Sequence, residues 1–302
     1  MKEISIITVT YNSKDYIGEA FRALEAPCKD GIVEWIVVDN ASQDDTADFI
    51  SKEFPWIEVI KSEENLGFGR GNNLGVRHSQ APYILFLNPD AVIDMPTIEC
   101  MLTFMKENPK AGITAPAIIE PEGTLQPWFL FPTPLRIFIR AIGLDRLFKQ
   151  MFYINPGSLP QLVECVGGAV FTVRRDVFEE LSGFDPKFFL YWEETDLCLR
   201  ATQNGWEIWT IGEAVARHTN AVSAKTHNKP MFAGCISEHF FRSRYYYLQK
   251  HYGKLHAWLT ETVELILLFI YSLAGRLTNR SFKYKLRERL SGTLYKLPED
   301  VQ

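Results

Sequence analysis

Residues 83–90 read YILFLNPD, a run of five mostly apolar residues followed by a short polar turn that an aspartate closes. The run is short and bounded by polar residues, which predicts a strand buried on both faces of a sheet. Three earlier segments, 4–9, 34–38 and 56–60, have the same form. Helix-like segments separate consecutive runs, so the sequence predicts an α/β fold with a mostly parallel central sheet and helices on both faces.

Polar residues follow these predicted strands at the point where each one ends. They are Thr10-Tyr11-Asn12, Asp39-Asn40 and Asn88-Pro89-Asp90. In open α/β sheets, ligands bind beyond the carboxyl ends of parallel strands. The sequence therefore predicts a ligand site at this edge of the sheet.

Two connecting segments carry more specific patterns. Residues 42–45 (SQDD) have the form of a capping box and predict the start of a helix through Phe49. Residues 65–75 (NLGFGRGNNLG) predict a glycine-rich loop leading into a helix that ends near Ser79, in which small residues let a nucleotide approach the backbone. The segment matches neither the phosphate-binding Walker pattern nor the dinucleotide-binding glycine pattern.

The second half of the chain is less regular. Residues 120–160 are rich in proline and contain a basic, apolar helix-like segment over 135–149. Residues 167–173 and 208–211 read as strands and 193–204 as a helix, and everything after 234 looks helical.

Length and composition narrow the class of protein. The chain of 302 residues suits one large α/β domain, or one domain with an appendage. With 46% hydrophobic and 23% charged residues it is not globally disordered, and a net charge of −5 argues against nucleic acid as a partner. Five widely spaced cysteines without a CxxC pair are expected to be reduced thiols, which predicts a cytoplasmic protein.

Two aspartates that follow strands suggest particular chemistry. The Asp90 carboxylate, held by a proline-stiffened turn, suits a hard divalent cation that also binds a diphosphate, although such residues also serve as turn or capping residues. The Asp39 carboxylate is placed to accept the N3–H of a uracil or thymine ring.

The motifs occur together in a recognisable order. They are residues 9–12 (VTYN), 38–42 (VDNAS), 65–73, 88–90 (NPD), 167–168 (GG), 183–185 (GFD) and 192–200 (WEETDLCLR). In this order they resemble family 2 glycosyltransferases of the GT-A fold, most closely the bacterial rhamnosyltransferase branch. The resemblance covers roughly residues 1–220.

The resemblance implies a nucleotide-diphosphate sugar donor, a divalent metal (Mg²⁺ or Mn²⁺) and inversion at the anomeric carbon. It implies that the donor is bound by Thr10, Tyr11, Asp39, Asn65, Gly69, Asn72, Asn88 and Asp90. The first three of these would hold the nucleoside. Two positions depart from the broad family pattern: Asn88 stands where an aspartate is frequent, and Asn72 where many relatives have a basic residue.

The acid cluster at the start of the 193–204 helix supplies the expected base. The resemblance assigns this role to Glu194, and the helix dipole is expected to favour its ionised form. Glu193 and Asp196 share a helix face that Glu194 does not, and with Trp192 they are the expected acceptor residues. The alternative is an acid-rich helix start that caps itself.

His218 follows the last sheet-like segment. GT-A relatives often supply a further metal ligand at this place, so the resemblance implies a metal site of Asp90 and His218. The alternative is a half-buried structural histidine.

The C-terminal region raises the question of a membrane. Residues 263–274 are apolar but shorter than a bilayer span, and the segment 276–289 that follows is strongly basic. This pattern suits a helix lying on the cytoplasmic face of an inner membrane, together with the 135–149 segment. The alternative, that these helices pack on the catalytic domain or form a dimer interface, stays open, as does the oligomeric state.

The sequence thus predicts a GT-A catalytic domain over 1–220 and a helical C-terminal region over 221–302. Within the domain, 1–120 is the expected nucleotide-binding half and 121–220 the acceptor half. The predicted reaction transfers a sugar, from the resemblance L-rhamnose of dTDP-rhamnose, to a glycan or lipid-linked acceptor in cell-surface polysaccharide synthesis. Two alternatives are a sugar nucleotidyltransferase, which normally has a basic glycine-rich loop after the first strand, and a non-catalytic nucleotide-sugar-binding scaffold.

Overall fold

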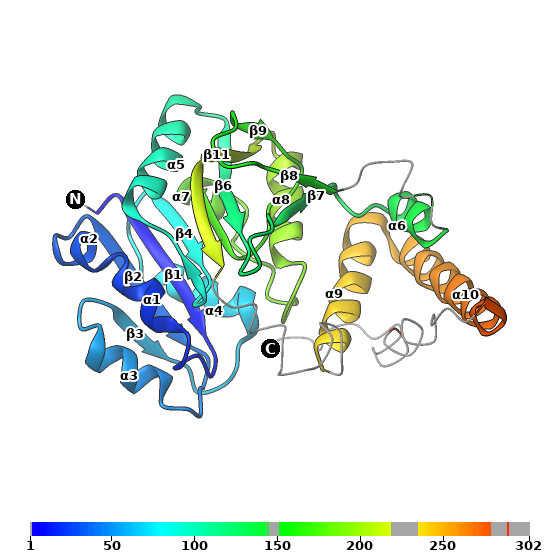
Figure 1. The fold of residues 1–302 in the computed structure, drawn as a ribbon, viewed down its shortest axis with the longest axis horizontal. Helices are drawn as coiled ribbons and strands as arrows, with labels where there is room; N and C mark the ends of the chain where they lie inside the picture. The colour runs from blue at the N-terminus through cyan, green and yellow to red at the C-terminus, as the bar shows by residue number, and fades with distance from the viewer. Residues whose placement is uncertain (1, 143, 145–150, 219–234, 279–288, 290–302) are drawn as a thin grey trace. The chain divides into compact units, whose positions relative to one another are not determined.

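The computed structural model describes residues 2–142, 144, 151–218, 235–278 and 289 (Figure 1). The chain divides into two compact units. The first is made of residues 1–130, 151–186 and 193–221, and the second of 131–150, 187–192 and 222–302. The boundary predicted at residue 220 lies in the segment 219–234, outside the described residues, and stays a prediction.

The first unit contains the four predicted strands. They are β1 (Ile4–Thr10), β2 (Val33–Asp39), β3 (Glu58–Lys61) and β4 (Tyr83–Leu87), which lie in the order β3-β2-β1-β4 and are all parallel. Residues on β1, β2 and β4 are almost all buried, as continuous apolar runs require. The α/β prediction is confirmed for this half of the sheet.

Beyond β4 the sheet is mixed. The order continues with β10 (Val170–Arg174), β6 (Ala111–Ile119), β11 (Glu207–His218) and β5 (Ala91–Val92), and β9 (Gln161–Leu162) pairs with β11. Strand β10 is antiparallel to both of its neighbours, whereas β11 is parallel to β6 and antiparallel to β5. The parallel arrangement that the sequence predicts therefore holds among β1 to β4. The later strands include both parallel and antiparallel pairs.

Helices cover both faces of this sheet. They are α1 (Ile17–Arg22), α2 (Glu25–Lys29), α3 (Thr46–Glu53), α4 (Gly67–Arg77), α5 (Met95–Glu107), α7 (Arg175–Glu180) and α8 (Glu193–Gln203). Alternate residues of β1 face opposite ways: Ile6 belongs to the core cluster that contains Phe21 of α1, while Ile7 lies against α4. A separate two-stranded sheet is formed by β7 (Pro127–Phe129) and β8 (Met151–Tyr153).

The glycine-rich segment is a helix rather than the predicted loop, because α4 already begins at Gly67. Its glycines let the helix approach β1 closely. A Cβ on Gly71 would lie 3.0 Å from Val9, and one on Gly75 would lie 2.5 Å from Cγ2 of Ile7. Both glycines are buried, so their small size serves the packing of helix on sheet.

The predicted capping box at residues 42–45 does not form. Helix α3 begins at Thr46, the residue after this segment. The Asp44 carboxylate accepts the backbone N–H of Thr46 at 3.1 Å. The Ser42 hydroxyl instead accepts the backbone N–H of Asn12 from the loop after β1. This cross-link between two loops is what competes with the local cap.

The second unit contains α6 (Pro134–Ala141), α9 (Cys235–Tyr252) and α10 (Lys254–Thr278). Helix α6 is the start of the predicted 135–149 helix, and its N-terminus is capped by Thr133, which accepts the Arg136 N–H. Residues 143 and 145–149 of that prediction lie outside the described residues. Helices α9 and α10 confirm a helical C-terminal region, and among the described helices none is both long and apolar enough to cross a membrane.

The packing of α4 gives a stability prediction. Gly75→Ala should lower the free energy of unfolding, relative to Gly18→Ala in α1, by about 1–3 kcal/mol because the added methyl group overlaps Ile7. The nearest atom to a Cβ on Gly18 lies at 4.0 Å, so both variants share the gain in helix propensity and differ in overlap. Urea denaturation measures the difference, and equal stability of the two variants would contradict the packing role.

Candidate functional site

The ends of β1 and β2 form one side of the site. The Asp39 carboxylate, which is buried, accepts the Thr10 hydroxyl at 3.2 Å and the Ser42 backbone N–H at 3.0 Å. Thr10 is fully buried, so its side chain acts on Asp39 and does not reach a ligand itself. Tyr11 is half exposed at the same edge. The two loops are further joined because Ser13 donates its N–H to the Thr46 hydroxyl.

The start of α4 lies beside these loops. Asn40, which follows β2, donates its side-chain amide to the Gly67 carbonyl and accepts the Leu66 N–H. Asn65, which precedes the helix, accepts the Gly67 N–H at 2.9 Å with its side-chain carbonyl. Of the other predicted donor residues here, Asn72 is buried and donates to the Phe68 carbonyl.

Gly69 has a packing role. A Cβ on it would lie 3.2 Å from Phe184 and 3.3 Å from Cγ of Glu193, so only glycine lets α4 meet the first turn of α8 here. This contact joins the predicted donor-binding segment to the acid cluster.

Strand pairing brings Asp90 and His218 together. Residue His218, at the end of β11, pairs with Ala91 of β5, which directly follows Asp90. Nε2 of His218 consequently lies 3.1 Å from Oδ1 of Asp90. The parallel pairing of β11 with β6 also brings in Glu120, whose Oε2 lies 3.2 Å from Nδ1 of His218.

The imidazole is thus held between two carboxylates. Burial alone lowers the pKa of His218, but hydrogen bonding and the charges of Asp90 and Glu120 outweigh burial, and the net shift is upward. A histidine with one nitrogen on a carboxylate and the other directed at a second ligand is the arrangement found where metals are bound. Within the described ranges there is no group of three or more His, Cys, Asp or Glu residues able to hold a metal ion. The pair Asp90 and His218 therefore offers one oxygen and one nitrogen ligand.

Glu194 lies close to this turn. A Cβ on Gly168 would be 3.8 Å from its Oε2, so the absence of a side chain there leaves room for the carboxylate. The neighbouring Ala169 carbonyl accepts the N–H of Asn88, which ties the segment beneath Glu194 to the turn that carries Asp90. The Glu194 carboxylate therefore lies against Gly168, whose segment adjoins the turn that carries Asp90.

The helix N-terminus is expected to favour the ionised form of Glu194, but the net shift of its pKa is upward, so this expectation is wrong. Burial raises the pKa of Glu194 to about 7, although its backbone N–H and the Thr195 hydroxyl lower it. The desolvation of the carboxylate exceeds the stabilisation that a helix N-terminus supplies. A carboxyl group with this pKa is close to the optimum for a base at neutral pH.

The two other acids of α8 are buried. Glu193 is 1% exposed, and burial, followed by the charge of Glu194, raises its pKa well above the usual range. Asp196 is fully buried and accepts Nε of Arg200 at 2.7 Å. The Arg200 guanidinium also donates to the carbonyls of Leu181 and Gly183, so this pair fastens α8 to the preceding loop.

The burial of Glu193 and Asp196 bears on their predicted contact with an acceptor. Neither side chain is presented to solvent, and both lie on the packed face of α8 that the sequence analysis separated from Glu194. Trp192 belongs to the second compact unit, where its ring packs against Phe240 and Tyr247. The two buried acids support the helix in this structure, and the acceptor contacts of Glu193, Asp196 and Trp192 stay predictions.

Two residues of the site were missed by sequence reasoning. Glu120 directly follows β6 and resembles the other polar strand ends, but its strand was not predicted. Arg200 stands four residues after Asp196, which is the spacing of a helical ion pair.

Comparison with known proteins identifies the family to which the chain belongs. Residues 5–182, more than half of the chain, match the model of glycosyl transferase family 2. The chain belongs to glycosyl transferase family 2. The low-salt glycan biosynthesis hexosyltransferase Agl10 of Haloferax volcanii is 29% identical to this glycosyltransferase, over 74% of the chain and 69% of the relative.

Two further similarities extend this result. An N-acetylglucosaminyl-diphospho-decaprenol L-rhamnosyltransferase of Mycobacterium tuberculosis is 25% identical, over 73% of this glycosyltransferase and 77% of the relative. The mannosyltransferase PcManGT from Pyrobaculum calidifontis, solved with GDP-Man and Mn²⁺, superposes with a TM-score of 0.58 at 13% identity, over 96% of this chain and 84% of that one. At that identity the likeness concerns the fold, and the GT-A prediction is confirmed.

The buried pair in α8 gives a second prediction. Asp196→Asn should lower the free energy of unfolding by about 3–5 kcal/mol, because it leaves the Arg200 guanidinium largely buried without its carboxylate. The matched control is Glu179→Gln in α7, whose exposed i,i+4 pair with Arg175 should contribute less than about 1 kcal/mol. Chemical denaturation distinguishes the two. An Asp196→Asn protein of normal stability that fails only in acceptor binding would restore the acceptor assignment.

Proposed function

We propose that this glycosyltransferase transfers a sugar from a nucleotide diphosphate to a hydroxyl of a glycan or lipid-linked acceptor, with inversion at the anomeric carbon. The observation that carries the proposal is Glu194, a carboxyl group with a pKa of about 7 that lies beside the turn carrying Asp90. An inverting displacement needs a base for the acceptor proton on one side and charge neutralisation of the leaving diphosphate on the other.

The donor would bind at the ends of β1 and β2. Asp39, held in place by Thr10 and Ser42, still has lone pairs that can accept from a pyrimidine N3–H, and the exposed Tyr11 ring can lie against the nucleoside. Asn65, Gly69 and Asn72 would shape the wall beside it. The Mycobacterium tuberculosis relative transfers L-rhamnose by name, which favours dTDP-rhamnose as the donor.

The metal would be held by Asp90 and His218. Asn88 lies on the same turn as Asp90 and is the candidate for a further oxygen ligand. Two protein ligands suit Mg²⁺ or Mn²⁺, which keep positions for phosphate oxygens and water. A cation bound there would neutralise charge on the departing diphosphate. The Glu120 carboxylate orients the imidazole from its other nitrogen.

The transfer itself would use Glu194. Its carboxylate accepts the proton of the attacking hydroxyl while the bond from the anomeric carbon to the diphosphate breaks. Glu193, which is buried, and Asp196, which pairs with Arg200, keep the first turn of α8 in place. A role for Trp192 at the acceptor stays part of the proposal.

The proposed setting is the cytoplasmic face of the membrane in cell-surface polysaccharide synthesis. The decaprenol-linked substrate in the name of the Mycobacterium tuberculosis relative supports a lipid-linked acceptor. Peripheral contact with that membrane would bring the chain to such a substrate.

The assignment of the base leads to a pH prediction. kcat/KM for transfer should fall about tenfold per pH unit below pH 7, because Glu194 is protonated there, and should level off above it. Glu194→Gln should reduce kcat by about 10²–10⁴-fold with donor affinity intact, and Glu194→Asp should retain part of the activity. Glu193→Gln is the matched control and should keep the pH profile. Near-normal transfer by Glu194→Gln would move the base to another residue.

The metal assignment can be tested without turnover. Mn²⁺ should raise the melting temperature of the donor-bound protein, and Asp90→Asn should abolish that metal-dependent increase because the diphosphate loses its bridge to the protein. Asp94→Asn is the matched control, since Asp94 caps α5 by accepting the Thr97 N–H and lies outside the site. Because asparagine caps a helix as well as aspartate does, this variant should keep both its stability and the metal effect. Full transfer activity in excess EDTA would contradict the assignment.

A further inference from the structure

Helix α10 carries large apolar side chains on its exposed face. Seven of them are between 44% and 65% exposed: Leu255, Trp258, Leu259, Ile266, Phe269, Ile270 and Leu273. Most are separated by one, three or four residues, so they form a single stripe along the helix. Isolated exposed apolar residues are ordinary on protein surfaces, but a continuous stripe of this size marks a contact surface.

The opposite side of α10 carries buried charges. Glu261 is 2% exposed and accepts Nε of Arg244, from α9, at 2.9 Å. Glu264 accepts Nη1 of Arg244 at 3.2 Å, and Arg289 contacts both glutamates. Arg244 and Arg289 are themselves 6% and 2% exposed.

This arrangement is the reverse of a water-exposed helix, which turns its apolar face inward and its charges outward. The ion pairs also fix the rotation of α10. Turning the apolar stripe inward would break the charge-assisted hydrogen bonds of Glu261 and Glu264. Separating a buried ion pair in this way is strongly destabilising. The outward apolar face is therefore built into the packing of α9 and α10.

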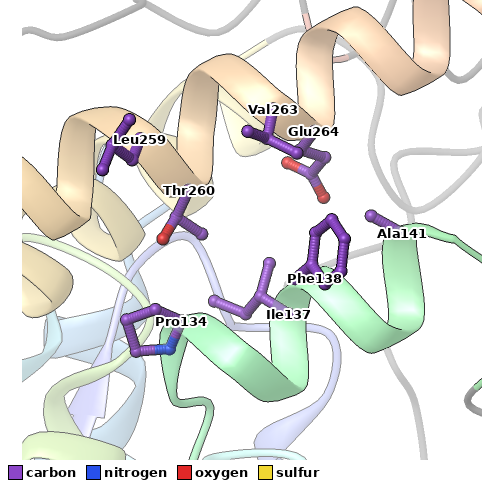
Figure 2. A pocket seen from close by; sticks show the side chains of 8 residues that line it. All are labelled: Pro134, Ile137, Phe138, Ala141, Leu259, Thr260, Val263 and Glu264. Atoms are coloured by element: carbon purple, nitrogen blue, oxygen red, sulfur yellow. The ribbon is translucent and has the colours of Figure 1, made fainter.

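Helix α6 extends the apolar surface. It packs against α10, and its Leu135 and Phe138 are 65% and 42% exposed. Between the two helices lies a cavity of about 160 Å³, shown in Figure 2, with Ile137 and Phe138 of α6 pointing toward Leu259 and Val263 of α10. Its lining is almost entirely apolar, apart from Thr260 and Glu264.

We propose that the exposed face of α10, together with α6, docks on the surface of an anionic phospholipid bilayer, with α10 lying in the plane of the membrane. A 25-residue helix that cannot span the bilayer but exposes an apolar stripe over residues 255–273 suits the boundary between headgroups and acyl chains. The cavity between α6 and α10 offers room for part of one acyl or isoprenoid chain.

Charge favours an anionic bilayer over a second copy of the chain. Arg140 on α6 and Lys254 at the start of α10 are exposed. The sequence from 276 to 289 contains six Arg and Lys residues and one acid, Glu288. Two copies docked through this face would bring the like charges of Arg140 and Lys254 toward their counterparts, whereas anionic headgroups would neutralise them.

The inference rests on the proposed function in one respect: contact with a bilayer serves the reaction because the proposed acceptor is lipid-linked. The test therefore measures binding and activity separately. Full-length protein is sedimented with vesicles of phosphatidylcholine and phosphatidylglycerol (3:1) or of phosphatidylcholine alone, and donor hydrolysis is assayed in the absence of vesicles.

The variant Ile266→Gln/Phe269→Gln/Ile270→Gln removes the centre of the stripe at positions that are already exposed. It should lower the partition coefficient for the anionic vesicles by at least about tenfold, and its donor hydrolysis should match the wild type. The matched control is Leu159→Gln/Leu162→Gln, two leucines of the first unit that are 78% and 58% exposed, and it should bind like the wild type. Binding of the wild type should be weaker to neutral vesicles.

Three results would overturn the proposal. They are equal binding by the triple variant and the wild type, absence of wild-type binding to anionic vesicles, and a wild-type dimer that the triple variant converts to a monomer without any vesicle binding by either. Circular dichroism checks the fold, and Leu255→Gln/Trp258→Gln at the other end of the stripe gives the same test if the first variant is unstable. Loss of donor hydrolysis with vesicle binding intact would instead count against the proposed function.

Discussion

The insertion of β10 between β4 and β6 is the constraint on which the site depends. Because β10 runs antiparallel to β4, the residues that precede β10 lie beside those that follow β4, and Ala169 accepts the Asn88 N–H. That single pairing puts Gly168, and over it Glu194, next to the turn that carries Asp90. The same insertion places β6 and then β11 farther along the sheet, so the end of β11 returns to pair with β5 and presents His218 to Asp90. A sheet of parallel strands alone would not bring these segments together.

The electrostatics of the site follow from this crowding. Glu193 and Glu194 adjoin in sequence, and burial raises the pKa of both, so holding two negative charges there is unfavourable. At His218 the ionised form is favoured instead, since the imidazole lies between the carboxylates of Asp90 and Glu120 and its pKa is raised. The two shifts therefore have different causes: burial raises the pKa of Glu194, whereas the two carboxylates raise the pKa of His218 against the effect of burial. Asp196, the third acid of α8, pairs with Arg200, and its charge still adds to the upward shift of the Glu193 pKa.

The sequence was sufficient to predict features that depend on local pattern. The four apolar runs became β1 to β4, and the polar residues that follow β1, β2 and β4 lie at one edge of the sheet. Burial on both faces leaves a plain hydrophobic signature in β1, β2 and β4, whereas the outermost strand β3 is only partly buried. Features set by tertiary contact were predicted poorly. The glycines of α4 suggested a loop because glycine disfavours helices, and only their distance to β1 explains why a helix needs them. Ser42 has the capping signature, but a hydrogen bond from the distant Asn12 decides its role. The pKa of Glu194 depends on burial, which no pattern of neighbours in the sequence reports.

Helix α10 shows the same limit from the opposite direction. In the sequence, Glu261 and Glu264 look like polar residues at the edge of an apolar segment, which would ordinarily place them in water. In the folded chain Arg244 and Arg289 reach them, and the ion pairs occupy the interior between α9 and α10. Because these ion pairs fill the inner side of α10, the large apolar side chains of the helix lie on its exposed side. Such a unit gains little from the hydrophobic effect in water and more from a surface that removes the stripe from water. The proposed bilayer contact accounts for this inversion. The choice of arginine over lysine for the buried cation follows from geometry, since the guanidinium fork of Arg244 can bind two carboxylates at once.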